Sequence, residues 1–284
     1  MAAKDPLISP ILKWVGGKRQ LLDQIRPLIP KFSTYYEPFI GGGAVLFDIQ
    51  PSKAIINDSN YELINVYNVI KDKPEKLIEK LYEHKEKNCK EYFYEVRGLD
   101  RDKKKYDLLS DVERAARIIY LNKTCYNGLF RVNSLGEFNS PWGKYKNPNI
   151  TNETTIRALS GYFNSNNIAI KCGDYREVLK DINIGEGSFV YLDPPYMPIS
   201  TSSSFTGYTA NGFGEEDQIA LKEQCDILNQ KGVKFLLSNS SCKFIEDLYK
   251  DYIITKVCAK RAINVKADRR GEIDEVLVRN YELD

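Results

Sequence analysis

The chain of 284 residues is 42% hydrophobic and 28% charged, with 41 basic side chains nearly balanced by 39 acidic ones. This composition, with 19 Tyr and 12 Phe, is typical of a folded globular protein and excludes a disordered chain. The formal net charge of +2 excludes a histone-like polycation, but it leaves room for a local basic surface that binds nucleic acid.

Histidine and cysteine usage excludes several kinds of catalytic site. The single histidine, His84, lies in the charged run 80–87 and is predicted to be a solvated helix residue. A Ser-His-Asp triad or a histidine metal centre would need a better placed residue, so we expect no metal site. No Cys-x-x-Cys pair occurs among the six cysteines, which excludes zinc ribbons and redox motifs.

The cysteines and the distribution of apolar residues predict the cellular location. We interpret the cysteines as reduced thiols, with disulfides as the alternative. The first residues contain no apolar signal core, and no stretch reaches the about 18 apolar residues of a membrane span. We therefore expect a cytoplasmic protein that does not bind a membrane.

Short apolar runs separated by helical stretches predict the fold. Runs of this kind, ending at Gly, Asp or Asn, are typical of strands buried on both faces. A helix is predicted from Glu215 to Lys231, with Gly232 as its left-handed cap. We therefore predict an α/β fold with a doubly wound, mostly parallel sheet. The predicted strands are 35–39, 54–56, 168–170, 189–192, 233–237 and 275–278.

The middle of the chain has a different pattern. A charged helix is predicted over 74–90, and Ser110-Asp-Val-Glu113 is a capping box that begins a second helix. Turn signals between 127 and 143 then indicate a hairpin or an irregular lobe. We predict an inserted, mainly helical subdomain over 66–160, which divides the α/β core into 1–65 and 161–284.

The glycine turn Gly41-Gly-Gly43 follows the first predicted strand and precedes a helix beginning near Ala44. Such a turn lets backbone N–H groups approach a ligand, and Asp58, at the end of the next strand, suits a ribose diol. These features predict a nucleoside-cofactor site of unspecified kind, with a turn that serves only packing as the alternative.

Two common nucleotide motifs do not fit these glycines. A P-loop would need Gly at Leu12 and Ser or Thr at Arg19, so Gly16-Gly-Lys18 is not one. A dinucleotide fingerprint would need a small residue at Leu46, which disfavours a hydride-transfer enzyme.

The turn Asp193-Pro194-Pro195-Tyr196 follows the apolar strand 189–192 and indicates the chemistry. Two prolines remove two N–H donors, so the turn presents a carboxylate and carbonyl oxygens without donors between them. This arrangement suits an NH₂ group, which donates two hydrogen bonds, and Tyr196 offers a flat face to a planar base.

Three motifs together, Asp-Pro-Pro-Tyr at 193–196, Glu-Pro-Phe-Ile-Gly-Gly-Gly at 37–43 and Leu-Lys-Trp-Val-Gly-Gly-Lys at 12–18, resemble the Dam-type (D12 class, alpha group) adenine-N6 DNA methyltransferases. The resemblance extends over nearly the whole chain. The family includes modification methylases of restriction systems. It implies an S-adenosylmethionine-dependent methyltransferase fold with a target-recognition insertion. Duplex DNA, commonly at GATC, would be the substrate.

The resemblance also implies roles for individual residues. The catalytic positions are Asp193, Pro194, Pro195 and Tyr196. The positions that contact S-adenosylmethionine are Trp14, Lys18, Phe39, Gly41, Asp58, Asp174 and Asp193. The positions around the DNA target are Lys13, Tyr126, Asn127, Leu129, Arg131 and Tyr145. Asp174 is also a candidate helix N-cap. For Arg131, contact with a guanine edge is favoured over a surface ion pair.

Direct methyl transfer to a flipped adenine needs neither metal nor histidine, and it is the predicted mechanism. Methylation of another planar amino group, such as cytosine N4, and DNA binding without catalysis are the alternatives, with a nicotinamide oxidoreductase third. Segment 197–214 is predicted to close over the site, or to be an ordinary surface loop. The basic segment 256–270 is predicted to bind phosphates or to form a solvated helix face. A monomer is expected.

Overall fold

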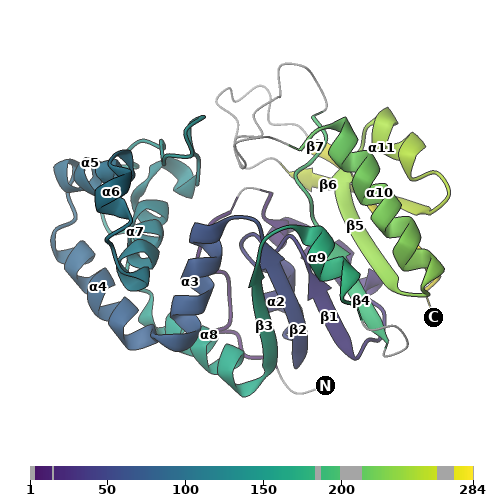
Figure 1. The fold of residues 1–284 in the computed structure, drawn as a ribbon, viewed down its shortest axis with the longest axis horizontal. Coiled ribbons are helices and arrows are strands. Elements are labelled where there is room, and N and C mark those ends of the chain that lie inside the picture. Colours follow the sequence, from purple (N-terminus) through teal and green to yellow (C-terminus); the bar gives the residue numbers. More distant parts are fainter. Residues whose placement is uncertain (1–3, 15, 183–186, 199–212, 261–271, 284) are drawn as a thin grey trace.

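The computed structural model describes residues 4–14, 16–182, 187–198, 213–260 and 272–283 (Figure 1). Seven strands form one sheet in the order β3-β2-β1-β4-β5-β7-β6. Strands β1 to β5 pair in parallel, whereas β7 is antiparallel to both β5 and β6. This topology confirms the predicted α/β fold with a mostly parallel sheet, and it is consistent with the methyltransferase fold that the resemblance implies. The strands are β1 Thr34–Glu37, β2 Lys53–Asp58, β3 Asn167–Cys172, β4 Ser188–Leu192, β5 Lys234–Ser240, β6 Ile253–Lys260 and β7 Glu272–Arg279.

Helices cover both faces of the sheet, which explains the apolar strand sequences. Successive side chains of a strand point to opposite faces. Tyr36, Val190 and Phe235 therefore pack under α9, α10 and α11, whereas Tyr35, Tyr191 and Leu236 lie in the core on the other face. The α-helices are α1 Leu22–Ile25, α2 Ala44–Ile49, α3 Tyr61–Asp72, α4 Pro74–Glu86, α5 Lys90–Gly98, α6 Lys103–Tyr106, α7 Asp111–Thr124, α8 Glu153–Ser165, α9 Tyr175–Lys180, α10 Glu215–Gln230 and α11 Lys243–Leu248.

Strands β1 and β4 are neighbours, paired in register from Thr34 with Ser188 to Tyr36 with Val190. From β1 the chain continues to β2 on one side, and from β4 it continues to β5 on the other. Ligands of open α/β sheets bind at such a switch point, beside the carboxyl ends of the strands. Both the glycine turn and the Asp-Pro-Pro-Tyr turn begin at this place.

Between β2 and β3 the chain forms helices α3 to α8, and α7 packs against α3, α4 and α5 (Figure 1). The predicted capping box is present: Ser110 Oγ accepts from Glu113 N, and Ser110 N donates to the Glu113 carboxylate. Segment 125–143 is an irregular lobe with two isolated antiparallel bridges. The predicted boundaries at 66 and 161 fall inside α3 and α8, so the division into domains stays a prediction.

The prediction that His84 is solvated is wrong. Its side chain is buried, its Nδ1 lies 2.8 Å from the Tyr92 hydroxyl, and its ring stacks on Tyr120 at 4.8 Å between centroids. Burial lowers the pKa of His84 to about 4, so the imidazole is neutral at pH 7. The reason is helix packing: His84 follows Leu81 and Leu77 on the face of α4 that is turned to the core.

In the described residues no disulfide joins any of the six cysteines. Within the same part of the chain, no helix has the length and apolar character needed to cross a membrane.

Candidate active site and nucleic-acid interface

The glycine turn after β1 brings Trp14 and Asp58 together. Gly41, with φ of 47°, donates its N–H to Asp58 Oδ2 at 3.0 Å and accepts from the Tyr67 hydroxyl at 2.6 Å. A Cβ atom at Gly41 would lie 2.9 Å from Cδ1 of Trp14, so only glycine allows the indole to lie so close. Three residues of the predicted cofactor set are therefore neighbours.

The carboxylate of Asp58 fits a ribose diol. Its Oδ1 accepts from Asn60 N at 2.9 Å while Oδ2 accepts from Gly41, which leaves lone pairs on both oxygens for two hydroxyl groups. Burial raises the pKa of Asp58, and the backbone N–H groups that donate to this carboxylate, those of Asn60 and Gly41 among them, oppose the rise. Beside it, the ring of Phe39 lies 4.9 Å from that of Tyr175, an aromatic surface for a planar base.

The ends of β2 and β3 are joined by Asn57, whose Nδ2 donates to the carbonyls of Pro38 and Gly173 at 3.1 and 3.0 Å. Asp174 follows and is the N-cap of α9, as expected, accepting from Arg176 N at 2.8 Å. Its Oδ2 also pairs with the Arg176 guanidinium at 2.8 Å. The N-cap prediction is confirmed, and Asp174 directly follows Gly173, whose N–H donates to the Asp58 carbonyl; no ligand is thereby assigned to it.

Lys18 links the glycine motifs to the Asp-Pro-Pro-Tyr turn. Its buried Nζ lies 2.7 Å from Asp193 Oδ1, 2.7 Å from the Gly16 carbonyl and 4.5 Å from the ring centroid of Tyr196. Burial raises the pKa of Asp193 to about 6, and the ammonium of Lys18 opposes this rise. The site therefore holds a carboxylate that changes protonation close to neutral pH.

Two glutamates complete this site, although neither was assigned a role in the sequence analysis. Glu37 is buried at the end of β1 and accepts from the Tyr35 hydroxyl at 2.8 Å. Burial raises the pKa of Glu37 well above its usual range, whereas the hydrogen bond from Tyr35 and the charge of Lys18 oppose this rise. Glu275, on β7, accepts from the Tyr196 hydroxyl at 2.6 Å and fixes the direction of that ring.

Asn122 joins the N-terminal segment to the irregular lobe. Its Oδ1 accepts from Lys13 N at 2.9 Å, and its Nδ2 donates to the carbonyls of Lys13 and Gly128 at 2.8 and 3.1 Å. Trp14 stacks on Phe130 at 4.6 Å between centroids. The two predicted regions, one for cofactor and one for DNA, are thus held together by a residue that we did not single out.

The predicted DNA residues gather in and beside this lobe. Tyr126 is 55% exposed and Tyr145 39% exposed, so a partner can reach both rings. Asn127 adopts a left-handed conformation, and Leu129 is half-buried. The structure therefore brings Lys13 next to the lobe and leaves the two tyrosine rings accessible.

Arg131 donates through Nε to Asn139 Oδ1 at 2.6 Å and through Nη2 to the Asn139 carbonyl at 3.3 Å. Among the described residues no carboxylate pairs with its guanidinium, so the structure does not support the alternative of a surface ion pair. Contact with a guanine stays a prediction.

Three cations converge where the lobe meets the core. Burial lowers the pKa of Lys123 to about 8, and the charges of Arg19 and Lys13 lower it further in the same direction. Holding three positive charges close together costs free energy unless an anion lies among them. This cluster therefore makes a surface that favours an anionic partner.

Two predicted segments fall wholly or partly outside the described residues. The predicted closing loop, 197–214, is described only at its ends, 197–198 and 213–214. The basic segment 256–270 begins in strand β6, not in a helix, and its residues 261–270 are not described. Lys256 pairs with Glu246 at 2.8 Å, so this one cation is already neutralised.

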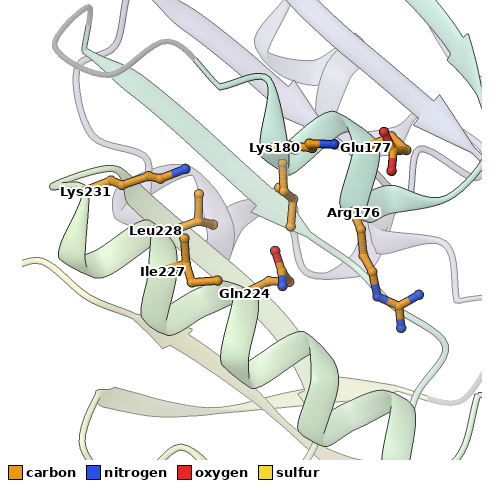
Figure 2. A pocket seen from close by; sticks show the side chains of 8 residues that line it. Arg176, Glu177, Lys180, Gln224, Ile227, Leu228 and Lys231 are labelled. Carbon is orange, nitrogen blue, oxygen red and sulfur yellow. The ribbon is translucent and has the colours of Figure 1, made fainter.

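A shallow hollow lies between α9 and α10 (Figure 2). It is lined by Arg176, Lys180, Gln224 and Lys231 among others, and none of the predicted site residues lines it. Among the described residues no group of three or more His, Cys, Asp or Glu side chains could hold a metal ion.

Comparison with known proteins gives the same family over most of the chain. Residues 14–263 match the family described as D12 class N6 adenine-specific DNA methyltransferase. The Type II methyltransferase M1.LlaDCHI of Lactococcus lactis is 49% identical over 96% of both chains. The Type II methyltransferase M.MjaIII of Methanocaldococcus jannaschii is 44% identical over 96% of this chain and 99% of its own. The DNA adenine methylase of Escherichia coli is 33% identical over 94% of this chain and 93% of its own. A protein with this sheet, these turns and these relatives belongs to the D12 class of N6 adenine-specific DNA methyltransferases.

Proposed function

We propose that this adenine-N6 DNA methyltransferase takes its methyl group from S-adenosylmethionine and acts on duplex DNA at GATC after flipping the target adenine out of the helix. The observation that carries the proposal is the Lys18–Asp193 contact, which joins the glycine motifs to the Asp-Pro-Pro-Tyr turn. It brings a candidate cofactor site and a candidate amino-group receptor to one switch point of the sheet.

For the cofactor we assign the ribose to Asp58 and the base to the surface formed by Phe39 and Tyr175. Trp14, Gly41, Asp174 and Lys18 complete the set. When bound, S-adenosylmethionine would supply an electrophilic methyl group on a positively charged sulfur. The carboxylates of Asp58 and Asp193 favour a cation at this place.

For the substrate we assign the two hydrogens of the adenine amino group to Asp193 and to the Pro194 carbonyl. Lys18 already contacts Oδ1 of Asp193, so the second oxygen, Oδ2, is the acceptor in this proposal. These hydrogen bonds draw the nitrogen lone pair out of conjugation with the ring, which makes N6 nucleophilic. Asp193, whose pKa is about 6, can then accept the proton that the amino group loses.

The base must leave the duplex, because the stacked helix hides its amino group from any active site. Tyr196 would stack on the extruded adenine, with its ring direction fixed by Glu275. The exposed rings of Tyr126 and Tyr145 and the cations Lys13, Arg19 and Lys123 support a DNA surface on the adjoining lobe. Arg131 is assigned to a guanine of the recognised sequence.

Transfer of tritium from labelled S-adenosylmethionine to duplex DNA tests the proposal. The wild-type chain should label adenine in a duplex with one GATC site, and Asp193→Asn should lower the rate at least about 100-fold because it removes the negative charge. Asp181→Asn is the matched control, since Asp181 is a surface carboxylate that pairs with Lys171. Label on cytosine, or full activity of Asp193→Asn, would overturn the mechanism.

The sequence specificity is tested with duplexes in which GATC is permuted or already carries N6-methyladenine. If both control duplexes were labelled as fast as the unmodified GATC duplex, GATC recognition would be contradicted. A restriction partner, action as a monomer and a cytoplasmic location remain parts of the proposal. The name Type II methyltransferase of two relatives supports the first. Resistance of modified DNA to a methylation-sensitive GATC endonuclease tests the modification that such a partner would require, and the mass of the chain in solution tests the monomer.

A further inference from the structure

Two buried amides hold the Asp-Pro-Pro-Tyr turn from the side opposite Lys18. Gln218, in the first turn of α10, donates through Nε2 to the Pro195 carbonyl at 3.0 Å. Asn239, near the end of β5, donates through Nδ2 to Gln218 Oε1 at 3.0 Å. Both side chains are fully buried. A chain of two hydrogen bonds therefore runs from the sheet, through α10, to the turn.

Asn239 also fixes the residue that follows Tyr196. Its Oδ1 accepts from Met197 N at 3.1 Å and from Ser240 N at 2.9 Å. The Ser240 hydroxyl in turn donates to the Met197 carbonyl at 2.7 Å. The backbone is thus held on both sides of Tyr196, at Pro195 and at Met197.

The turn needs such external support because of its own composition. Pro194 and Pro195 have no N–H, so between Asp193 and Tyr196 the chain cannot fix its shape with its own donors. Its carbonyls must be held by donors from elsewhere. A buried amide that lacks its hydrogen-bond partner costs about 1–3 kcal/mol of stability. Removing either Gln218 or Asn239 would therefore leave the other amide buried without its partner.

We propose that Gln218 and Asn239 are positioning residues for methyl transfer. Their paired amides commit the Pro195 carbonyl to the protein interior, and this sets the direction of the preceding Pro194 carbonyl and of Asp193 toward the adenine amino group. The inference rests on the proposed role of the Asp-Pro-Pro-Tyr turn, and it adds two residues that do not touch the substrate.

Gln218→Met tests the proposal, because methionine fills a similar volume but neither donates to Pro195 nor accepts from Asn239. A misplacement of about 1 Å can cost about 100-fold in rate, so we expect kcat to fall about 10- to 100-fold. The dissociation constants for S-adenosylmethionine and for DNA should stay within about twofold of the wild type. Gln224→Met, the same change at a partly exposed position on the same helix, should leave kcat unchanged.

A second pair of variants shows whether the two amides act as one unit. If they do, Gln218→Met in the background of Asn239→Ala should lower kcat no further than Asn239→Ala alone. Independent, multiplicative losses would overturn the pairing. An unchanged kcat in Gln218→Met, with or without a lower Tm and weaker cofactor binding, would show that the amides contribute to stability alone and would overturn the proposal.

Asp193→Asn in the same assay separates this inference from the proposed function. If Asp193→Asn is inactive while Gln218→Met has the wild-type kcat, only the positioning role fails. If Asp193→Asn keeps full activity, the turn is not the catalytic element, and both the proposed function and this inference fail.

Discussion

Asp193 lies where burial and one cation act on its carboxylate in opposite directions. Burial raises the pKa of Asp193 to about 6 and the negative charge of Glu275 adds to this, whereas Lys18, 2.7 Å away, lowers it. A carboxylate must be ionised to accept two hydrogen bonds and to stabilise a neighbouring positive charge. In the proposed mechanism, the protonation of this one residue therefore sets the acid side of the pH profile.

We expect the single-turnover rate of methyl transfer to rise with pH through about 6 and to level off above it, because Asp193 is protonated below that pH. Lys18→Met removes the charge that lowers the pKa of Asp193, so the rise of the rate with pH should occur at higher pH in this variant. Rates measured between about pH 5 and 9 with saturating cofactor and DNA check this. Lys171→Met, which removes a surface partner of Asp181, is the control and should keep the wild-type midpoint. A rate that does not change with pH over this range would contradict the assignment of Asp193.

The packing of helix α2 determines the position of the glycine turn. Helix α2 begins directly after Gly43, which has a φ of 71° and is its N-cap. A Cβ atom on Gly43 would lie 2.5 Å from Cε2 of Phe47, inside the first turn of the helix. Phe47 is buried against Tyr67 and Phe163, so it has no room to move away. The third glycine of the motif is thus required by packing in this chain.

Gly43→Ala should destabilise the protein by about 2–4 kcal/mol, because it adds left-handed strain to a steric overlap in the core. Gly161→Ala is the matched control: Gly161 lies on the exposed side of α8, and a Cβ there would meet no atom within 4 Å. That variant should be about 0.5–1 kcal/mol more stable than the wild type. Urea unfolding of the three proteins measures both differences. Equal midpoints for Gly43→Ala and the wild type would show that α2 can shift to accept the methyl group.

Much of the sheet was predictable from the sequence because its central strands β1, β4 and β5 are buried on both faces and form continuous apolar runs. Strand β6 was not predicted, since Thr255 and Lys256 interrupt its apolar residues, as edge strands allow. The burial of His84 could have been predicted from its spacing to Leu77 and Leu81, but its charged neighbours outweighed that pattern. The contacts between Gln218, Asn239 and the turn could not, because residues far apart in sequence carry no periodic signal of hydrogen bonding.

At the scale of the whole molecule, the core and the lobe meet at the segment that carries Lys13, Trp14 and Lys18. The motifs predicted which residues gather on each side of this joint, since each motif is local in sequence. They did not predict Asn122, which is 2% exposed and makes two hydrogen bonds to Lys13 across the joint and a third to Gly128 in the lobe. Any ligand that fixes the N-terminal segment must therefore also fix the base of the lobe.

This geometry predicts that cofactor and DNA bind cooperatively. Both contact the segment 13–18 in our proposal, and Asn122 ties its backbone to Gly128, so ordering by one ligand reduces the entropy that the other must lose. Asn122→Ala leaves the amide and carbonyl of Lys13 without their partner, which frees the segment from the lobe. Cofactor should then tighten DNA binding less in Asn122→Ala than in the wild type, and DNA should tighten cofactor binding less by the same factor, as linkage requires.

The dissociation constant of a GATC duplex, measured with and without S-adenosylhomocysteine, gives the coupling factor for each variant. Asn164→Ala is the control, because Asn164 is exposed and donates to the Lys71 carbonyl, between α8 and α3 and away from the joint. It should keep the wild-type coupling. Asn122→Ala could also keep the wild-type coupling factor while both affinities fall. Asn122 would then stabilise the lobe without linking the binding of one ligand to that of the other, and the two sites would be independent.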